Sequence, residues 1–307
     1  MAKSKESAAA AAGTSSVSTA GTVDRHFLHQ AKSLEEKLIE MRRHLHEYPE
    51  LSFHEHKTAA LMKDKLDSYG YKTKAGVGKT GVIGDLGKDG PVIAIRADMD
   101  GLPIDETNPN KYISKNKTVM HACGHDGHMA CGLTAAQMLS QTELPGRVRM
   151  VMQPAEEATD SDGKSGAWRM LEDNALDGVS AIIGLHADAS LKAGQVGIIS
   201  GPAMAACDGF KVTIKGKGGH GAYPETTVDP VVIGAQVVQA IQQIVSRRVS
   251  ALEPAIITIG AFHSSSTRGN IISDYVELEG SFRSFSQAVR EHIIAELDKA
   301  CSIARAL

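Results

Sequence analysis

The stretch Met120–Ala130 constrains this chain more than any other part of its sequence. It reads MHACGHDGHMA and places one cysteine, three histidines and one aspartate within a few positions of one another. Thiolates, imidazoles and carboxylates are the side chains that bind transition metals in proteins. Burying so many of them without a cation would leave charges and polar atoms uncompensated. We therefore expect the fold to supply the rest of a metal site around this stretch.

Composition and charge narrow the class of protein. The chain has 307 residues, 42% of them hydrophobic, which is enough for one large or two ordinary globular domains. A net charge of −3 provides no basic field of the kind that holds nucleic acid or a membrane surface. No apolar run approaches the roughly 18 residues that span a bilayer. We expect a soluble protein whose partners are small molecules, with no nucleic-acid or membrane partner.

The N-terminal residues and the cysteines bear on localisation. Residues 1–23 are rich in Ala, Ser, Thr and Gly, which cannot bury enough surface to fold, so we predict a disordered tail. The four cysteines show no disulfide framework, which fits a reducing compartment. We therefore predict a cytoplasmic protein. An organelle is the alternative, because a tail poor in acidic residues is also compatible with a transit peptide.

Two helices are predicted near the start of the folded part. Apolar residues recur at helical spacing from Phe27 to Leu45, which predicts one helix that Pro49 ends. Ser52 and Glu55 then have the spacing of a capping box. This pair predicts the start of the second helix.

Short β-rich runs then alternate with helical segments, as in an open α/β sheet. The runs 81–86 and 92–97 flank a Lys-Asp-Gly turn and are predicted to form a hairpin. The runs 92–97, 147–152 and 179–184 are each followed by acidic residues or a histidine. Because sites in open α/β sheets form at the carboxyl ends of strands, we expect these residues to meet at one edge.

Four residues from three loops compose the predicted metal site, namely Cys123, His125, Glu157 and His186. This ligand set suits zinc, although manganese, cobalt and nickel remain open. Structural zinc sites gather closely spaced ligand pairs, whereas a site assembled from strand ends is more often open and catalytic. Glu156 adjoins Glu157, so its side chain diverges and can face a water at the metal as general base. The pair predicts metal-assisted amide hydrolysis.

The sequence motifs of two other kinds of enzyme are absent from the chain. Zinc-dependent deamination uses similar ligands, but neither a His-x-Glu nor a Pro-Cys-x-x-Cys motif occurs in the chain. A nucleophilic serine mechanism is also disfavoured, because no Gly-x-Ser-x-Gly elbow is present.

A second α/β unit begins around Asp208. Its predicted elements are a strand at 210–215, a helix capped by Asp229, strands at 255–262 and 271–282, and a helix at 287–306. The order β-α-β-β-α lacks the last strand of a βαββαβ unit. Because an open sheet edge would result, we expect the chain to be truncated.

Several motifs together resemble a known family. RADMDGLP, MHACGHDGH, QPAEE, GLH and GGHGAYP follow one another in this order. They resemble the metal-dependent amidohydrolases of the aminoacylase/carboxypeptidase superfamily. The nearest branch contains hippurate hydrolases, N-acyl amino acid amidohydrolases and indole-acetyl amino acid hydrolases. The resemblance runs from about Leu38 to the end of the chain.

The resemblance implies a metallopeptidase-like α/β fold. A catalytic domain, residues 24–206, would carry helices on both faces of its sheet and hold two divalent metal ions. A smaller inserted α/β lid, residues 207–307 and incomplete here, would also form a homodimer. The implied reaction is hydrolysis of a small-molecule N-acyl amino acid by a metal-activated water with a glutamate base. Zinc or manganese is expected, with cobalt and nickel as alternatives.

The resemblance also assigns roles residue by residue. The metal ligands of the family match the four predicted ligands of this chain, and the family's general base matches Glu156. His220, in the lid, would reach across the dimer to stabilise the tetrahedral oxyanion. The remaining matches are Asn270 and Arg283, which would grip the substrate, and Asp98 and Asp100, which would orient ligands rather than bind metal.

The sequence ends before the family's return from the lid to the catalytic domain, which supplies a last histidine ligand. We therefore expect this chain to be weakly active or inactive. Two alternatives to the amidohydrolase stay open. One is a non-catalytic fragment that binds metal or dimerises, and the other is a dipeptidase or carboxypeptidase of the same superfamily.

Overall fold

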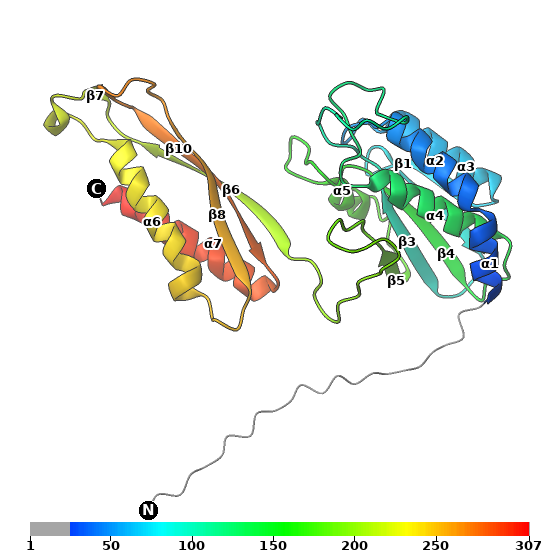
Figure 1. Cartoon of the computed structure of the whole chain (residues 1–307). Coiled ribbons are helices and arrows are strands. Elements are labelled where there is room, and N and C mark those ends of the chain that lie inside the picture. Colours follow the sequence, from blue (N-terminus) through cyan, green and yellow to red (C-terminus); the bar gives the residue numbers. More distant parts are fainter. Residues whose placement is uncertain (1–24, 307) are drawn as a thin grey trace, which may run out of the picture. The chain divides into compact units, whose positions relative to one another are not determined.

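A computed structural model describes residues 25–306, which form two compact units that divide between Ser190 and Leu191 (Figure 1). The predicted disordered tail and the transit peptide fall on residues 1–23, which lie outside this range. The predicted domain boundary follows residue 206, whereas residues 191–206 group with the second unit. Within residues 25–306, no helix combines the length and apolar character needed to cross a lipid bilayer.

The first unit contains α1 (Arg25–Ser33), α2 (Glu35–Glu47), α3 (His56–Ser68), β1 (Lys72–Val77), β2 (Gly81–Gly87), β3 (Val92–Asp98), α4 (His125–Ser140), β4 (Arg147–Gln153), α5 (Gly166–Glu172) and β5 (Val179–Gly184). Its five strands form one sheet in the order β1-β2-β4-β3-β5. β3 runs parallel to β4 and β5, and β2 runs antiparallel to β1 and β4.

The predicted hairpin of β2 and β3 is wrong, because β4 lies between these two strands. The Lys-Asp-Gly turn at 88–90 is a local signal, and it connects strands that are not neighbours. β3 instead takes parallel partners on both sides. The first four residues of β3, 92–95, are all apolar, as in a central strand with both faces covered, so they do not specify which strand lies beside it.

The predicted first helix is two helices, because the chain breaks between α1 and α2 at Leu34. α2 ends before Pro49, as expected. The predicted capping box is wrong: Glu55 is the N-cap residue of α3, yet its side chain makes no capping hydrogen bond. Ser52 and Glu55 instead bond to the loops that follow β3 and β4. Tertiary partners have therefore replaced the local partners that the spacing suggested.

Helices cover both faces of the sheet, which confirms the predicted fold class. The larger apolar cluster packs residues of α2, α3 and α4 against the sheet and contains the buried methionines 62, 99, 129, 150 and 152. A smaller cluster includes Met170 of α5 together with Val77, Ala94 and Val151 of three strands. Since the central strands β3 and β4 are mostly buried, polar side chains gather at their ends.

The carboxyl ends of β3, β4 and β5 meet at one edge of the sheet. Asp98 ends β3 directly beside Gln153, which ends β4. β5, on the other side of β3, ends at Gly184, just before His186. The prediction that these strands deliver their polar residues to a common edge is therefore confirmed.

The second unit contains β6 (Ala206–Lys215), β7 (Gly219–His220), a short 3-10 helix (Pro224–Thr226), α6 (Pro230–Arg248), β8 (Ala255–Ser264), β9 (Ile271–Ile272), β10 (Tyr275–Ser284), α7 (Gln287–Ser302) and a 3-10 turn (Ile303–Arg305). β6, β10 and β8 form an antiparallel sheet in that order, and β7 pairs with β9. Asp229 accepts the N–H groups of Val231 and Val232, which confirms it as the cap of α6.

Candidate metal centre

Gly124, the residue before α4, lets two loops approach closely. Its φ of +88° lies in the left-handed region that favours glycine. A Cβ atom at this position would lie 2.9 Å from the Cβ of Ala187, in the loop after β5. The close approach brings Cys123 Sγ to 3.3 Å from His186 Nε2. Two predicted ligands that are far apart in the sequence are therefore in contact.

His125, the first residue of α4, lies at the centre of the candidate site. Its Nδ1 is 2.8 Å from the carbonyl oxygen of Asp100. Because a carbonyl can only accept, Nδ1 carries the proton, and in the neutral ring Nε2 keeps its lone pair. That Nε2 lies 3.7 Å from Glu157 Oε1 and 3.9 Å from Glu156 Oε2. A metal-binding histidine is commonly held by such a bond from its other ring nitrogen.

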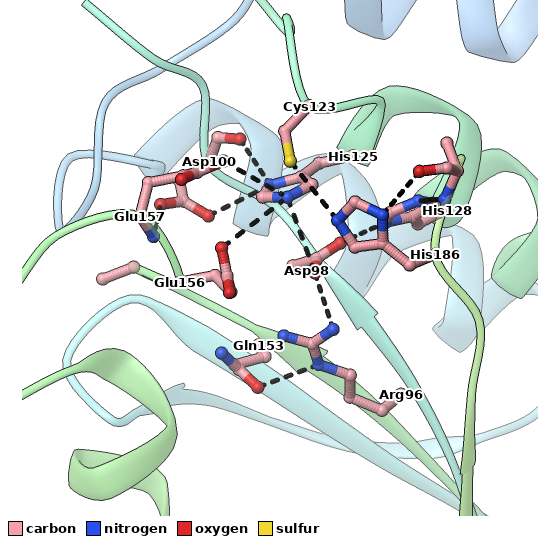
Figure 2. A network of polar contacts seen from close by, with 12 residues as sticks. Arg96, Asp98, Asp100, Cys123, His125, His128, Gln153, Glu156, Glu157 and His186 are labelled. Atoms are coloured by element: carbon pink, nitrogen blue, oxygen red, sulfur yellow. Dashed lines mark hydrogen bonds and ion pairs between the residues drawn. The ribbon is translucent and has the colours of Figure 1, made fainter. Parts of the chain in front are cut away.

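Potential ligand atoms form groups that all include His125. One group joins Cys123, His125 and His186, and a second joins His125, Glu156 and Glu157, with the ligand atoms of each group within 4.8 Å of one another. Figure 2 shows His125 between the two glutamates on one side and His186 on the other. The structure thus brings the four predicted ligands and the predicted base together.

The buried polar atoms of this cluster fit a divalent cation. His125 Nε2 and Glu157 Oε1 are both buried and make no hydrogen bond within the described structure. Their separation of 3.7 Å is too long for a hydrogen bond, yet both atoms could ligate one ion at about 2.0–2.2 Å. A cation would also compensate the negative charge of the neighbouring carboxylates.

Asp98 and His128 hold the loop that carries His186. The Nδ1–H of His128 donates to Asp98 Oδ1 at 2.6 Å, and His128 Nε2 accepts the N–H of Ala187 at 2.8 Å. The Nη1 of Arg96 lies 2.6 Å from Asp98 Oδ2. A third group of potential ligands contains Asp98, His125 and His128. Since both nitrogens of His128 already have partners, this group is better explained as a support for the site.

Asp100 supports the opposite side of the site. Its Oδ2 accepts the hydroxyl of Ser52 at 2.6 Å and the N–H of Glu157 at 3.0 Å. Burial alone would raise the pKa of this carboxyl, but the nearby His125 ring and the hydrogen bonds from Ser52 and Glu157 lower the pKa to about 2. Asp100 is therefore ionised at neutral pH and orients a ligand and the backbone beside Glu156.

Burial and charge also shift the pKa values of the reactive groups. Burial, together with the neighbouring carboxylate of Glu157, raises the pKa of the Cys123 thiol to about 12. Burial and the charge of Glu157 raise the pKa of Glu156 above its usual value. A carboxylate with a raised pKa is a stronger base than an ordinary one, which suits a group that accepts a proton.

The remaining predicted site residues belong to the second unit. His220 is exposed on β7, and the N–H of Gly221 donates to the carbonyl of Asn270 at 2.9 Å, so these two positions are neighbours. Arg283 lies near the opposite end of β10, about 25 Å along the strand from Tyr275. Within this unit, the structure does not bring Arg283 to His220 and Asn270.

Sequence reasoning missed the supporting roles of Arg96 and Ser52. Arg96 precedes Asp98 by two positions on one strand, so the two side chains lie on the same face. That spacing could have predicted their ion pair. No comparable signal links Ser52 to Asp100, because the contact depends on how the loop before α3 packs.

Residues 94–276 match the profile of Peptidase family M20/M25/M40. An N-acetyl-L-cysteine deacetylase of Bacillus subtilis is 46% identical over 265 residues, which cover 85% of this chain and 62% of that protein. An N-acyl-L-amino acid amidohydrolase of Geobacillus stearothermophilus is 44% identical over 260 residues, covering 83% of this chain and 69% of that protein. The chain thus spans roughly two thirds of the length of these curated relatives.

Solved structures agree with the sequence comparison. The crystal structure of a dinuclear metal binding peptidase of the M20 family from Bacillus subtilis is 37% identical and matches with a TM-score of 0.73. The match covers 90% of this chain and 71% of that chain. The resemblance noted from the motifs is confirmed, and the chain belongs to peptidase family M20/M25/M40.

Proposed function

We propose that the protein is a metal-dependent hydrolase that cleaves the amide bond of N-acyl amino acids. The observation that carries this proposal is the pair of buried atoms without a hydrogen bond, His125 Nε2 and Glu157 Oε1, beside the partly exposed carboxylate of Glu156. The relatives named as a deacetylase and an N-acyl-L-amino acid amidohydrolase support the substrate class.

Two divalent metal ions would be held by Cys123, His125, Glu157 and His186. A thiolate and imidazoles favour zinc, and manganese is the next choice, with cobalt or nickel as alternatives. When bound, the ions would polarise an amide carbonyl and lower the pKa of a water molecule. Because a thiolate is the binding form of Cys123, metal binding would release the thiol proton.

Glu156 would be the general base. Its side chain is 39% exposed, whereas that of His125 is fully buried, so Glu156 is the group that an arriving substrate can reach. It accepts a proton from the attacking water and delivers it to the departing amino nitrogen, which splits the amide into a carboxylic acid and an amino acid. Asp100 and Asp98 hold their neighbours in place while this proton moves.

The residues of the second unit have proposed roles toward the substrate. His220 would stabilise the oxyanion, and Asn270 and Arg283 would bind the substrate, since an arginine fork suits a free carboxylate. We also propose that this unit forms a homodimer. The four cysteines are free in the structure, and a metal-binding Cys123 requires a reduced thiol, which favours the cytoplasm.

The direct test is metal-dependent turnover. The protein is stripped with a chelator, supplied in turn with zinc, manganese, cobalt or nickel, and incubated with N-acetyl, N-benzoyl and indole-acetyl amino acids. Release of the free amino acid that depends on added metal is the expected result. Protein that binds metal yet releases no amino acid from any of these substrates would contradict the proposal.

A peptidase is the second candidate, because the similar solved structure is described as a dinuclear metal binding peptidase. Dipeptides therefore belong in the same assay. A peptidase would cleave dipeptides faster than the corresponding N-acetyl amino acids, and an amidohydrolase would show the reverse preference.

A further inference from the structure

Glu55 is a buried carboxyl group that neither helix capping nor metal binding explains. It is 0% exposed. Its Oε1 accepts the N–H of Ala155 at 2.7 Å, and its Oε2 accepts the hydroxyl of Thr80 at 2.5 Å. Ala155 directly precedes the Glu156-Glu157 pair. The contact therefore joins the start of α3 to the turn that presents the proposed base and one proposed ligand.

The backbone of that turn is strained and held in place by its surroundings. Ala155 has a φ of +44°, which residues with a Cβ rarely adopt. Its carbonyl accepts the N–H of Gly166 at 2.9 Å, and a Cβ on Gly166 would lie 1.8 Å from the carbonyl oxygen of Pro154. A strained residue persists only when its surroundings hold it, and Glu55 supplies the contact on the N–H side.

Two carboxylates thus hold backbone amides on the two sides of Glu156. Glu55 accepts the amide of Ala155 before it, and Asp100 accepts the amide of Glu157 after it. The loop 52–55 supports both, because Ser52 donates its hydroxyl to Asp100. With both flanking amides fixed, the directions of the two glutamate side chains are set by the backbone.

We propose that Glu55 is a positioning residue, which holds the turn at Ala155 so that Glu157 faces the metal site and Glu156 faces the substrate. The proposal rests on the proposed function, since it takes Glu157 as a ligand and Glu156 as the base. Burying a carboxyl group costs free energy, and an apolar side chain would fill the same space without that cost. Burial raises the pKa of Glu55 in spite of its hydrogen bonds, which agrees with such a cost.

The test compares three substitutions at Glu55 with a matched core variant. Glu55→Ala removes the acceptor, and Glu55→Asp shortens the side chain so that it no longer reaches Ala155. Glu55→Gln keeps an oxygen of the same reach. Leu66→Ala is the control, because Leu66 is 0% exposed, lies in the apolar cluster of the same unit and has no polar atom that could bond to the turn at Ala155.

The first readout is hydrogen–deuterium exchange of the metal-free protein in the peptide covering residues 154–158. We expect faster exchange there in Glu55→Ala and Glu55→Asp, near wild-type exchange in Glu55→Gln, and no selective change in Leu66→Ala. If Glu55→Ala does not fold, the exchange measured in Glu55→Asp tests the proposal instead. A folded Asp variant with wild-type exchange at these residues would overturn the proposal, even if the wild-type protein binds no metal and the proposed function fails.

The second readout is metal affinity, measured by calorimetric titration with zinc. Loss of an outer contact typically weakens metal binding by about 10–100-fold, and we expect this loss for Glu55→Ala with recovery in Glu55→Gln. Leu66→Ala should bind zinc like the wild type although it is also less stable. Equal affinity in Glu55→Ala and wild type, or equal weakening in Leu66→Ala, would contradict a positioning role.

Discussion

The first unit buries charged and polar side chains at one edge of its sheet, whereas the second unit builds its core from aliphatic residues and one phenylalanine. The fully buried side chains of the first unit include Glu55, Asp98 and His125. The core of the second unit contains Ile241, Val276 and similar residues, with few polar groups among its buried side chains.

This difference indicates where the chemistry lies. Burying charges lowers stability unless each charge has a partner, and such clusters collect where a protein needs shifted pKa values or a metal. In the first unit, such buried charged groups lie around His125, where they lower stability. In the second unit the predicted site residues His220 and Arg283 are exposed, so they can be substituted with little effect on folding.

The largest expected effect contrasts two histidines. His125→Ala removes the residue shared by all the ligand groups, so we expect metal affinity to fall by more than the ~100-fold of an outer-contact loss. His220→Ala removes an exposed side chain of the second unit and should leave metal affinity within about twofold. Zinc titration of both variants checks this. Equal losses would remove the distinction between the units.

A substitution in the core of one unit should leave the stability of the other unit unchanged. Ile241→Ala opens a cavity at a residue that is 0% exposed and should destabilise the second unit by about 2–5 kcal/mol. The single tryptophan, Trp168, lies in α5 of the first unit. We therefore expect the unfolding transition followed by circular dichroism to shift while the transition followed by tryptophan fluorescence stays. Matching shifts in both signals would show that the units unfold together.

His46 gives the first unit a pH-dependent stability. Its hydrogen bond to Asp126 raises its pKa above the usual 6.5, with burial opposing and Glu106 adding to the rise. Because the folded pKa is raised, this stabilisation is complete below pH 6.5 and disappears as the pH rises through the folded pKa. His46→Gln should therefore cost about 1–3 kcal/mol at pH 6 and less at pH 9. Urea unfolding at pH 6 and pH 9 measures this loss of stability. A loss that does not depend on pH would contradict a raised pKa of His46.

The smallest effect is expected at the start of α6. Asp229 caps this helix through the N–H groups of Val231 and Val232, so Asp229→Ala should cost about 1 kcal/mol. Asp229→Asn, which keeps a capping oxygen, should cost much less. Thermal unfolding followed by circular dichroism would detect the difference, and an unchanged midpoint in the Ala variant would show that the cap contributes nothing.

Structural features that depend on a local residue pattern or on a sequence motif could be predicted from the sequence. The strands that end in polar residues, the cap at Asp229 and the convergence of Cys123, His125, Glu157 and His186 could all be predicted before the structure was known. The strand order could not, because residues 92–95 are all apolar and do not indicate which strands lie beside them. The partners of a parallel strand come from segments that are distant in the sequence. The nearby turn at 88–90 therefore suggested the wrong partner for β3.

The role of Glu55 shows the same limit at the site. Its spacing from Ser52 fits a capping box, and only the packing of α3 against the turn at Ala155 reveals its other partner. Contacts between residues a hundred positions apart leave no periodic signal. Long-range hydrogen bonds therefore had to come from the structure, even where the residues that make them stood out in the sequence.

The most direct test of the central claim is the Glu156→Gln variant, assayed for bound metal and for turnover of an N-acyl amino acid. Glutamine has the size of glutamate but does not accept a proton. We expect wild-type metal content with turnover lowered by about 10²–10⁴-fold, the usual contribution of a general base. Turnover equal to that of the wild type, with metal still bound, would contradict it.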